Sequence, residues 1–68
     1  MKVHVRFDGT SLDFSLHELD LGTNTSDRQV KRAVAHRLSL PEQKFQAYVV
    51  DRNRRTGDLT LRPQAVFG

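Results

Sequence analysis

The chain has 68 residues, no cysteine and a formal net charge of +3, and these features exclude several classes of protein. A chain of this length buries only roughly 60% of the surface that its unfolded form exposes, so its core is thin. Without cysteine, neither disulfide bonds nor a cysteine-ligated zinc ion can compensate. No apolar run approaches the roughly 20 residues of a membrane-spanning helix, and the alternating N-terminus MKVHVRF is unlike a secretory signal. We therefore expect one small, soluble, cytoplasmic domain with no membrane partner.

The charge is unevenly distributed along the chain. Residues 1–30 contain three basic and five acidic side chains, a net of −2, whereas residues 31–68 contain eight basic and three acidic ones, a net of +5. This asymmetry predicts a cationic face that suits an acidic partner. The alternative interpretation is a solvated basic surface with no particular partner.

Residues 3–16, VHVRFDGTSLDFSL, predict a β-hairpin from two independent signals. Asp8-Gly9 is a favoured two-residue turn, because a type I′ turn requires positive φ at both central residues. With that turn at the tip, the apolar side chains fall on one face and the polar ones on the other. The apolar face pairs Phe7 with Thr10, Val5 with Leu12 and Val3 with Phe14; the polar face pairs Arg6 with Ser11, His4 with Asp13 and Lys2 with Ser15. After Leu16 the apolar positions change parity, which indicates a bulge or bend near His17-Glu18.

Residues 26–38, SDRQVKRAVAHRL, predict an amphipathic helix after the loop LGTNTS. Ser26 is a good N-cap, and Gln29 three residues later completes a capping box. Asp27 suits the positive end of the helix dipole, and Pro41 prevents the helix from continuing. The positions expected to face a sheet recur every three or four residues: Val30, Ala33, Val34, Arg37 and Leu38.

Residues 44–52, KFQAYVVDR, predict a third strand. Strand alternation assigns Phe45, Ala47 and Val49 to the face under the helix, and Gln46, Tyr48 and Val50 to the open face. Because both faces carry apolar residues, we expect an inner strand. The Arg-rich tip NRRTGD then leads into a fourth strand, DLTLRP, which Pro63 terminates. Residues 65–67 are expected to form one further short extended piece.

The order hairpin, helix, hairpin predicts an α+β fold in which one helix covers one face of a four-stranded mixed sheet. In such a layout the first and last strands usually lie side by side in the centre. This ββαββ arrangement is the β-grasp, and the residues resemble ubiquitin and its prokaryotic relatives over most of the chain. SDRQVKRAVAHRLSLPEQKFQAYVV is similar to the ubiquitin segment in which an N-capped helix is followed by a Pro-acidic-Gln turn, filled here by Leu40, Pro41, Glu42 and Gln43. GDLTLRPQAVFG resembles the last strand and tail. Two features differ: the stretch before the last strand is shorter, and the chain ends Phe67-Gly68 where ubiquitin ends in two glycines.

The resemblance implies a single ubiquitin-like domain, residues 1–68, that has no catalysis of its own and acts by binding other proteins. Ubiquitin-like proteins usually dock through a small apolar patch with a basic rim on the open face of the sheet. We therefore expect protein recognition through the exposed sheet face and the Arg-rich tip, with strand addition at an exposed edge as a second route. The residues of this expected surface are Tyr48, Val50, Arg52, Arg54, Arg55 and Arg62.

Two other functions remain open. In the first, the protein is a covalent modifier or sulfur carrier that an activating enzyme joins to its target through the carboxylate of Gly68, whose lack of a Cβ leaves the carbonyl accessible. In the second, it is a small basic nucleic-acid-binding protein, for which Tyr48 is the one aromatic residue expected beside the arginines.

No pattern of side chains indicates catalysis or a metal site. The sequence contains neither a nucleophile elbow nor a Gly-rich phosphate loop. Its three imidazoles, His4, His17 and His36, lack the spacing and further ligands of a zinc site. His4 is expected to contact Asp13 across the hairpin surface. We therefore expect no enzymatic activity, no metal and no cofactor.

Overall fold

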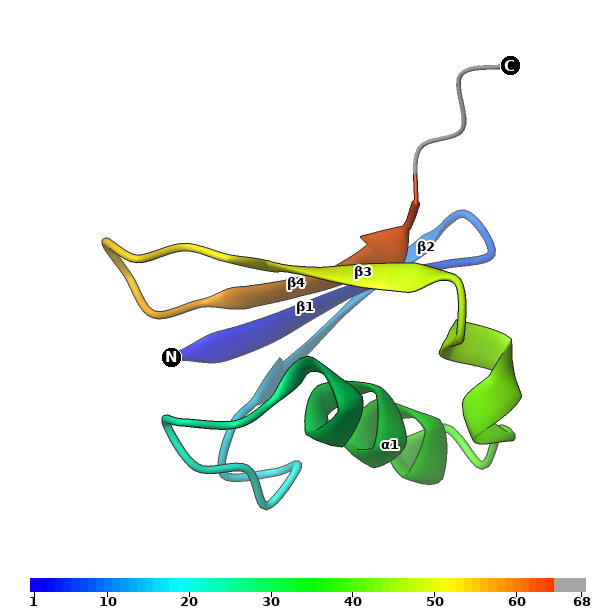
Figure 1. Cartoon of the computed structure of the whole chain (residues 1–68), viewed down its shortest axis with the longest axis horizontal. Helices are drawn as coiled ribbons and strands as arrows, with labels where there is room; N and C mark the ends of the chain where they lie inside the picture. The colour runs from blue at the N-terminus through cyan, green and yellow to red at the C-terminus, as the bar shows by residue number, and fades with distance from the viewer. Residues whose placement is uncertain (65–68) are drawn as a thin grey trace.

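The structure, a computed structural model, describes residues 1–64 and has an α+β architecture in which one α-helix crosses one face of a four-stranded mixed sheet (Figure 1). Its elements are β1 (Lys2–Phe7), β2 (Thr10–Ser15), α1 (Asp27–Arg37), the short 3₁₀ helix η1 (Glu42–Phe45), β3 (Tyr48–Arg52) and β4 (Leu59–Pro63). The strand order is β2-β1-β4-β3, with a parallel central pair and antiparallel outer pairs. The predicted α+β class, four-stranded mixed sheet and central pair are confirmed, whereas the predicted order ββαββ is interrupted by η1, which was not predicted.

The first hairpin has the predicted register at all six pairs. Asp8 and Gly9 have φ angles of 49° and 74°, as the two-residue turn requires. The predicted bend follows directly after the hairpin. There the Ser15 N–H donates to the Glu18 carboxylate at 3.1 Å, and the Glu18 N–H donates to the Ser15 hydroxyl at 3.0 Å. This turn directs Leu19 into the core, where it is 7% exposed.

Helix α1 begins and ends through local contacts. The Gln29 N–H donates to the Ser26 hydroxyl at 3.2 Å and the Ser26 N–H donates to the Gln29 side chain at 2.8 Å, which confirms the capping box. The helix stops before Pro41, because Ser39 has a φ of 56° and leaves the helical conformation. Its buried residues are Val30, Val34 and Ala35; Ala35 was absent from the predicted stripe.

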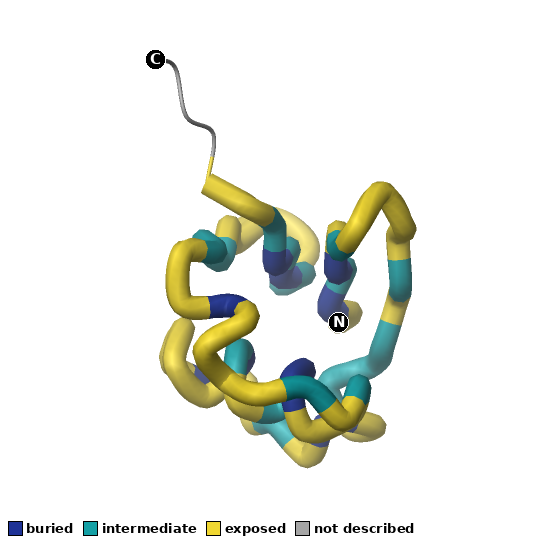
Figure 2. The backbone as a smooth tube through the Cα atoms, turned by 90° about the vertical axis from the view of Figure 1, so that its right-hand side faces the viewer, coloured by how far each residue is buried: buried dark blue, intermediate teal, exposed yellow. Residues whose placement is uncertain are grey.

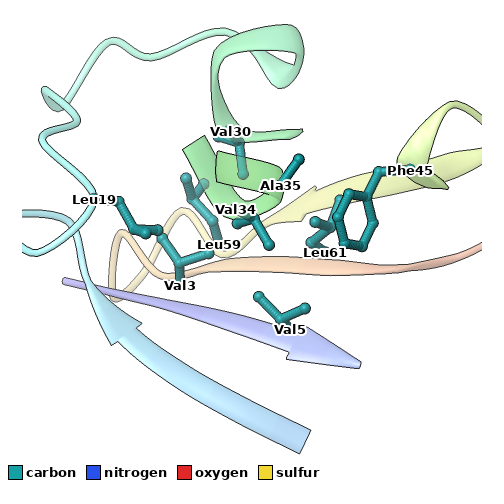
Figure 3. Packing of buried hydrophobic residues seen from close by; sticks show 9 residues of the cluster. All are labelled: Val3, Val5, Leu19, Val30, Val34, Ala35, Phe45, Leu59 and Leu61. Carbon is teal, nitrogen blue, oxygen red and sulfur yellow. The ribbon is translucent and has the colours of Figure 1, made fainter. Parts of the chain in front are cut away.

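The core lies between α1 and the side of the sheet that faces it (Figure 3). Its buried apolar residues are Val3, Val5, Leu19, Val30, Val34, Ala35, Phe45, Leu59 and Leu61. Most of the remaining backbone is exposed on the outside of the molecule (Figure 2). The fully buried residues of the sheet all lie on the central strands β1 and β4, because the outer strands β2 and β3 contain none. Both outer strands therefore keep apolar side chains in partial contact with solvent.

The third strand starts later than predicted, at Tyr48. Residues 42–45 form η1, and Gln46 still has helical backbone angles, with φ −58° and ψ −40°. Strand alternation therefore cannot be continued from Phe45 into β3. Phe45 is fully buried, as predicted, but from η1, while Ala47 is exposed instead of facing the core.

The assignment of β3 side chains to the two faces was consequently wrong. Tyr48 and Val50 lie opposite Pro63 and Leu61 and pack against the core on the helix side of the sheet. Val49 takes the open face in their place. The prediction of an inner strand was also wrong, because β3 pairs only with β4 within residues 1–64 and forms an edge of the sheet.

Candidate protein-binding surface

The face of the sheet that α1 leaves uncovered is polar and charged. Its strand residues are those that alternate with the core positions: Lys2, His4, Arg6, Ser11, Asp13, Ser15, Val49, Asp51, Thr60 and Arg62. Val49 is the single apolar side chain among them. The expected apolar patch with a basic rim is therefore not the arrangement found on this face, since Tyr48 and Val50 point to the other side.

His4 joins three segments at one end of this open face. Its Nδ1 lies 2.7 Å from Asp13 Oδ1 on β2, as predicted, and its Nε2 lies 3.5 Å from Asp58 Oδ2, just before β4. The hydrogen bond to Asp13 is the main reason that the pKa of His4 is raised, with Asp58 adding to it against the opposing effect of desolvation. The pKa of Asp58 is lowered, first because the Lys2 N–H donates to its carboxylate at 2.9 Å and then through His4.

Arg6 and Arg62 lie on the two central strands at the other end of the open face. Arg62 forms an ion pair with Asp51 of β3, whereas Arg6 has no carboxylate partner within residues 1–64. Together with residues 7–11 and 63–64, both arginines line an open hollow of about 430 Å³. Because the guanidinium group binds carboxylates in a planar, two-pronged geometry, this end of the face is suited to an acidic group.

Arg52, which was predicted to belong to the binding tip, instead connects β3 to the start of α1. Its Nη2 donates to the Thr25 carbonyl at 2.8 Å and to Asp27 Oδ1 at 2.6 Å. These contacts direct the guanidinium toward the helix N-terminus. Arg52 therefore has a structural position that no local sequence signal reveals, because its partners lie 25 and 27 residues away.

Arg54 and Arg55 are at the tip of the second hairpin, as predicted, and both are exposed. Their side chains form no hydrogen bond or ion pair with other residues of the described range 1–64. The tip is held by Asn53, whose side-chain oxygen accepts from the Arg55 N–H at 3.0 Å and from the Thr56 N–H at 3.3 Å. Gly57, with a φ of 80°, completes the turn.

Tyr48 does not stand out as an exposed ring. It meets Phe45 edge to face, with ring centroids 4.9 Å apart, and Phe45 in turn lies 5.6 Å from Phe7. Burial raises the pKa of Tyr48, and the negative charge of Asp8 adds to this effect. The three rings fix η1 beneath one end of the sheet, so Tyr48 serves the core and gives no stacking platform beside the arginines.

The ion pairs leave a marked surplus of cations. Within residues 1–64, four of the eight carboxylate side chains form ion pairs with arginines and two more, Asp13 and Asp58, contact His4, whereas only four of the eleven Lys and Arg side chains have a carboxylate partner. The seven others are Lys2, Arg6, Arg28, Lys31, Lys44, Arg54 and Arg55. The uneven charge of the sequence predicted a cationic face. Arg6 was predicted on the polar face of the first hairpin, as found, but not as a binding residue, whereas Val49 was wrongly assigned to the face under the helix.

Gly68, the predicted conjugation terminus, and the predicted extended piece at 65–67 lie outside the described residues. Within residues 1–64 no helix is long and apolar enough to cross a membrane, and no cluster of His, Asp or Glu side chains is arranged to hold a metal ion. Comparison with family models, curated proteins and solved structures finds no significant match.

Proposed function

We propose that the chain is a ubiquitin-like β-grasp protein that acts by recognising acidic surfaces of other proteins. The strand order β2-β1-β4-β3 and the single helix across one face support the fold assignment. The function is supported above all by the charge surplus: within residues 1–64, seven Lys and Arg side chains lack a carboxylate partner, whereas four carboxylate side chains lack a Lys or Arg partner and two of these contact His4. A surface with this imbalance attracts anionic partners and speeds their association.

The cationic surface that we assign consists of Arg6, Arg62, Arg54 and Arg55, with Val49 as its apolar member. These arginines form two clusters. Arg6 and Arg62 lie on adjacent central strands beside Val49, and Arg54 and Arg55 lie at the tip beyond the opposite end of β3 and β4. Arginine is among the residues enriched at binding hot spots, because it combines charge, planar hydrogen bonding and apolar contact. Three residues of the surface expected from the sequence do not belong to it: Tyr48, Val50 and Arg52. Each of them makes contacts inside the fold.

Protein recognition is favoured over nucleic-acid binding by the position of the aromatic rings. Binding of single-stranded nucleic acid relies on bases stacking on exposed aromatic side chains beside the cations. The strand residues of the open face include no Phe, Tyr or Trp, and Tyr48 packs on Phe45. Within residues 1–64 the arginines therefore offer charge and hydrogen bonds without a stacking surface.

Titration of the labelled protein with two probes tests this function by nuclear magnetic resonance. The probes are a short peptide rich in Asp and Glu and a single-stranded oligonucleotide of equal negative charge. We expect the peptide to shift the signals of Arg6, Arg62 and the tip, and Arg54→Glu to weaken its binding several-fold. Arg37→Glu is the matched control, because it changes the charge equally at the end of α1 beside Glu18 and Phe14, away from the tip and from Arg6 and Arg62.

Tighter binding of the oligonucleotide than of the peptide would contradict protein recognition and favour nucleic-acid binding as the function. Equal losses in Arg54→Glu and Arg37→Glu would mean that only net charge matters, and the assigned surface would be wrong. The binding constants should fall with salt for either probe, so salt dependence alone does not separate them.

A further inference from the structure

Within residues 1–64 the outer edge of β3 pairs with no other strand. The Asn53 N–H donates to the Asp58 carbonyl at 2.9 Å, so the backbone of Asn53 points toward β4. Alternation along an antiparallel ladder then directs the backbone groups of Asp51 and Val49 toward β4 as well. The N–H and C=O groups of Tyr48, Val50 and Arg52 consequently point away from the sheet. These six groups have no hydrogen-bond partner within residues 1–64.

The β3 edge also lacks the features that usually prevent strands from pairing. Proteins protect edge strands with charges, prolines or bulges. The segment from Tyr48 to Val50 carries none of these, and all three side chains are half-buried. The two charged side chains that follow form ion pairs with residues away from this edge: Asp51 with Arg62, and Arg52 with Asp27.

The opposite edge of the sheet, formed by β2, is protected by comparison. By the same alternation, its outward-pointing backbone groups belong to Ser11, Asp13 and Ser15. Ser15 is already occupied, because its N–H donates to Glu18 and its carbonyl accepts from the Leu19 N–H at 3.4 Å. Asp13, in the middle of this edge, directs its carboxylate to His4 on β1. Both edges carry partly buried apolar side chains, Leu12 and Phe14 on β2 and Tyr48 to Val50 on β3. They differ in the backbone, because β2 already uses the outward groups of Ser15, whereas β3 leaves all three outward positions without a partner within residues 1–64.

Cations lie near both ends of the β3 edge. At its start, Lys31 of α1 approaches the Gln46 carbonyl, with its Nζ 3.4 Å away. The hollow between α1 and η1 begins here, with a volume of about 590 Å³. The residues lining it are Asp27, Arg28, Lys31, Arg32, Glu42, Gln43 and Gln46. In Figure 1, β3 and α1 lie one above the other and η1 joins them at one end, opposite the hairpin tip. At the other end of β3 follow the exposed Arg54 and Arg55.

We propose that the outer edge of β3 binds an extended segment of a partner protein as a fifth strand, and that this segment is β-branched in its middle and acidic at its ends. The middle would lie beside Val49 and Val50, and the acidic ends would meet Lys31 and Arg54. Main-chain hydrogen bonds supply affinity in this mode of recognition, while side chains supply specificity. This inference rests on the proposed function, because it assumes that the partner is a protein, and it adds where and how the partner binds.

A second copy of the chain fits this edge less well. Two antiparallel β3 strands centred on Val50 would bring Arg54 and Arg55 of each copy toward the start of β3 in the other. That region already carries Lys31 and Lys44, which have no ion pair within residues 1–64. Each copy also has a formal net charge of +3. Cations would thus face cations at both ends of such a dimer.

Amide hydrogen exchange on the whole protein tests the proposal residue by residue. The probe is a synthetic peptide of alternating Val and Thr with two acidic residues at each end. At a free peptide concentration of ten times its Kd, exchange of the Tyr48, Val50 and Arg52 amides should slow by about tenfold. The Val49 and Asp51 amides already bond to β4 and should change little. A control peptide with proline at alternate positions keeps the charge but cannot form a strand, so it should leave all five amides unchanged.

Mutation of the edge gives an independent readout. Because the Val50 N–H points outward, Val50→Pro removes a donor from the edge without breaking the β3–β4 ladder. It should weaken peptide binding at least several-fold, whereas Ser11→Pro, at an outward-pointing position of β2, should not. If Val50→Pro fails to fold, the exchange measurement on the unmutated protein decides alone.

The possible results separate this inference from the proposed function. Peptide binding that shifts the tip but leaves the three outward amides in fast exchange would overturn strand addition at β3 and keep acidic-surface recognition. Failure of both acidic peptides to bind would overturn both. Concentration-dependent protection of the same amides in the free protein, together with dimers in sedimentation, would assign the edge to a second copy and overturn the choice of partner.

Discussion

Replacing Arg52 tests whether this side chain holds β3 to α1 or belongs to a binding tip. Arg52→Ala removes one hydrogen bond to the Thr25 carbonyl and one ion pair to Asp27. The ion pair is partly solvated, with side-chain exposures of 41% and 58%, and contributes about 0–1 kcal/mol. The bond to Thr25 contributes more, about 1–1.5 kcal/mol, because its donor is charged and Thr25 is only 7% exposed. We expect a total loss of about 2 kcal/mol.

A loss of that size should lower the Tm of so small a domain by about 10 °C. The assay is thermal and urea unfolding followed by circular dichroism, with Arg54→Ala as the matched control. Arg54 is exposed and its side chain forms no hydrogen bond or ion pair within residues 1–64, so its removal should change stability by less than about 0.5 kcal/mol. Asp27→Asn should cost less than Arg52→Ala, because the bond to the Thr25 carbonyl remains. Equal losses in Arg52→Ala and Arg54→Ala would refute the structural assignment of Arg52.

Two further predictions concern stability. The pKa of His4 is raised above its ordinary value of 6.5 in the folded protein. The contacts of His4 therefore stabilise the fold fully below pH 6.5, and this stabilisation is lost as the pH rises through the folded pKa. In urea unfolding, the unmutated protein should exceed the His4→Gln variant in free energy of unfolding by more at about pH 5.5 than at about pH 8.5. The opposite order would contradict the contacts of His4 with Asp13 and Asp58. Phe45 is fully buried and touches the Tyr48 ring, so Phe45→Ala should cost about 3–5 kcal/mol and leave the chain largely unfolded. Phe45→Leu should cost about 1–2 kcal/mol and still fold, and a Phe45→Ala protein of nearly normal Tm would show that η1 is not held by the aromatic cluster.

Local chemistry explains why the first hairpin and the helix could be predicted in detail. In the hairpin, the Asp8-Gly9 turn and the alternation of apolar residues specify the same register, and each acts over a few residues. The start of the helix is likewise set by side chains three residues apart, in the capping box of Ser26 and Gln29. Where a short segment contains all the partners of an interaction, its sequence is sufficient to predict the structure.

The faces of the third strand could not be predicted by alternation, because a short helix interrupts it. The signal for η1 was present in Pro41-Glu42, since proline and acidic residues are common where helices begin. Because these residues were predicted to form only a turn, the strand was predicted to begin at Lys44. Its side chains were consequently assigned to the wrong faces of the sheet. Tyr48 and Val50 were thereby assigned to solvent, although they lie against Leu61 and the aromatic cluster.

The position of β3 at an edge and the partners of Arg52 depend on contacts between distant segments. Apolar residues on both faces of a strand indicate burial, but not whether a neighbouring strand supplies it. In this fold α1 and η1 cover one side of β3 and leave its backbone edge open. The same apolar composition that suggested an inner strand is therefore the reason to expect pairing with another chain.

The parallel pair of β1 and β4 has a mechanical consequence. This pair is the one ladder that connects the two hairpins within the sheet. A force that pulls the first residue of β1 and the last residue of β4 apart would slide the two strands along each other, because they run in the same direction side by side. The bonds between them would then be loaded together instead of one after another. The domain should resist stretching between these two residues more strongly than a sheet of the same size whose strands separate one hydrogen bond at a time.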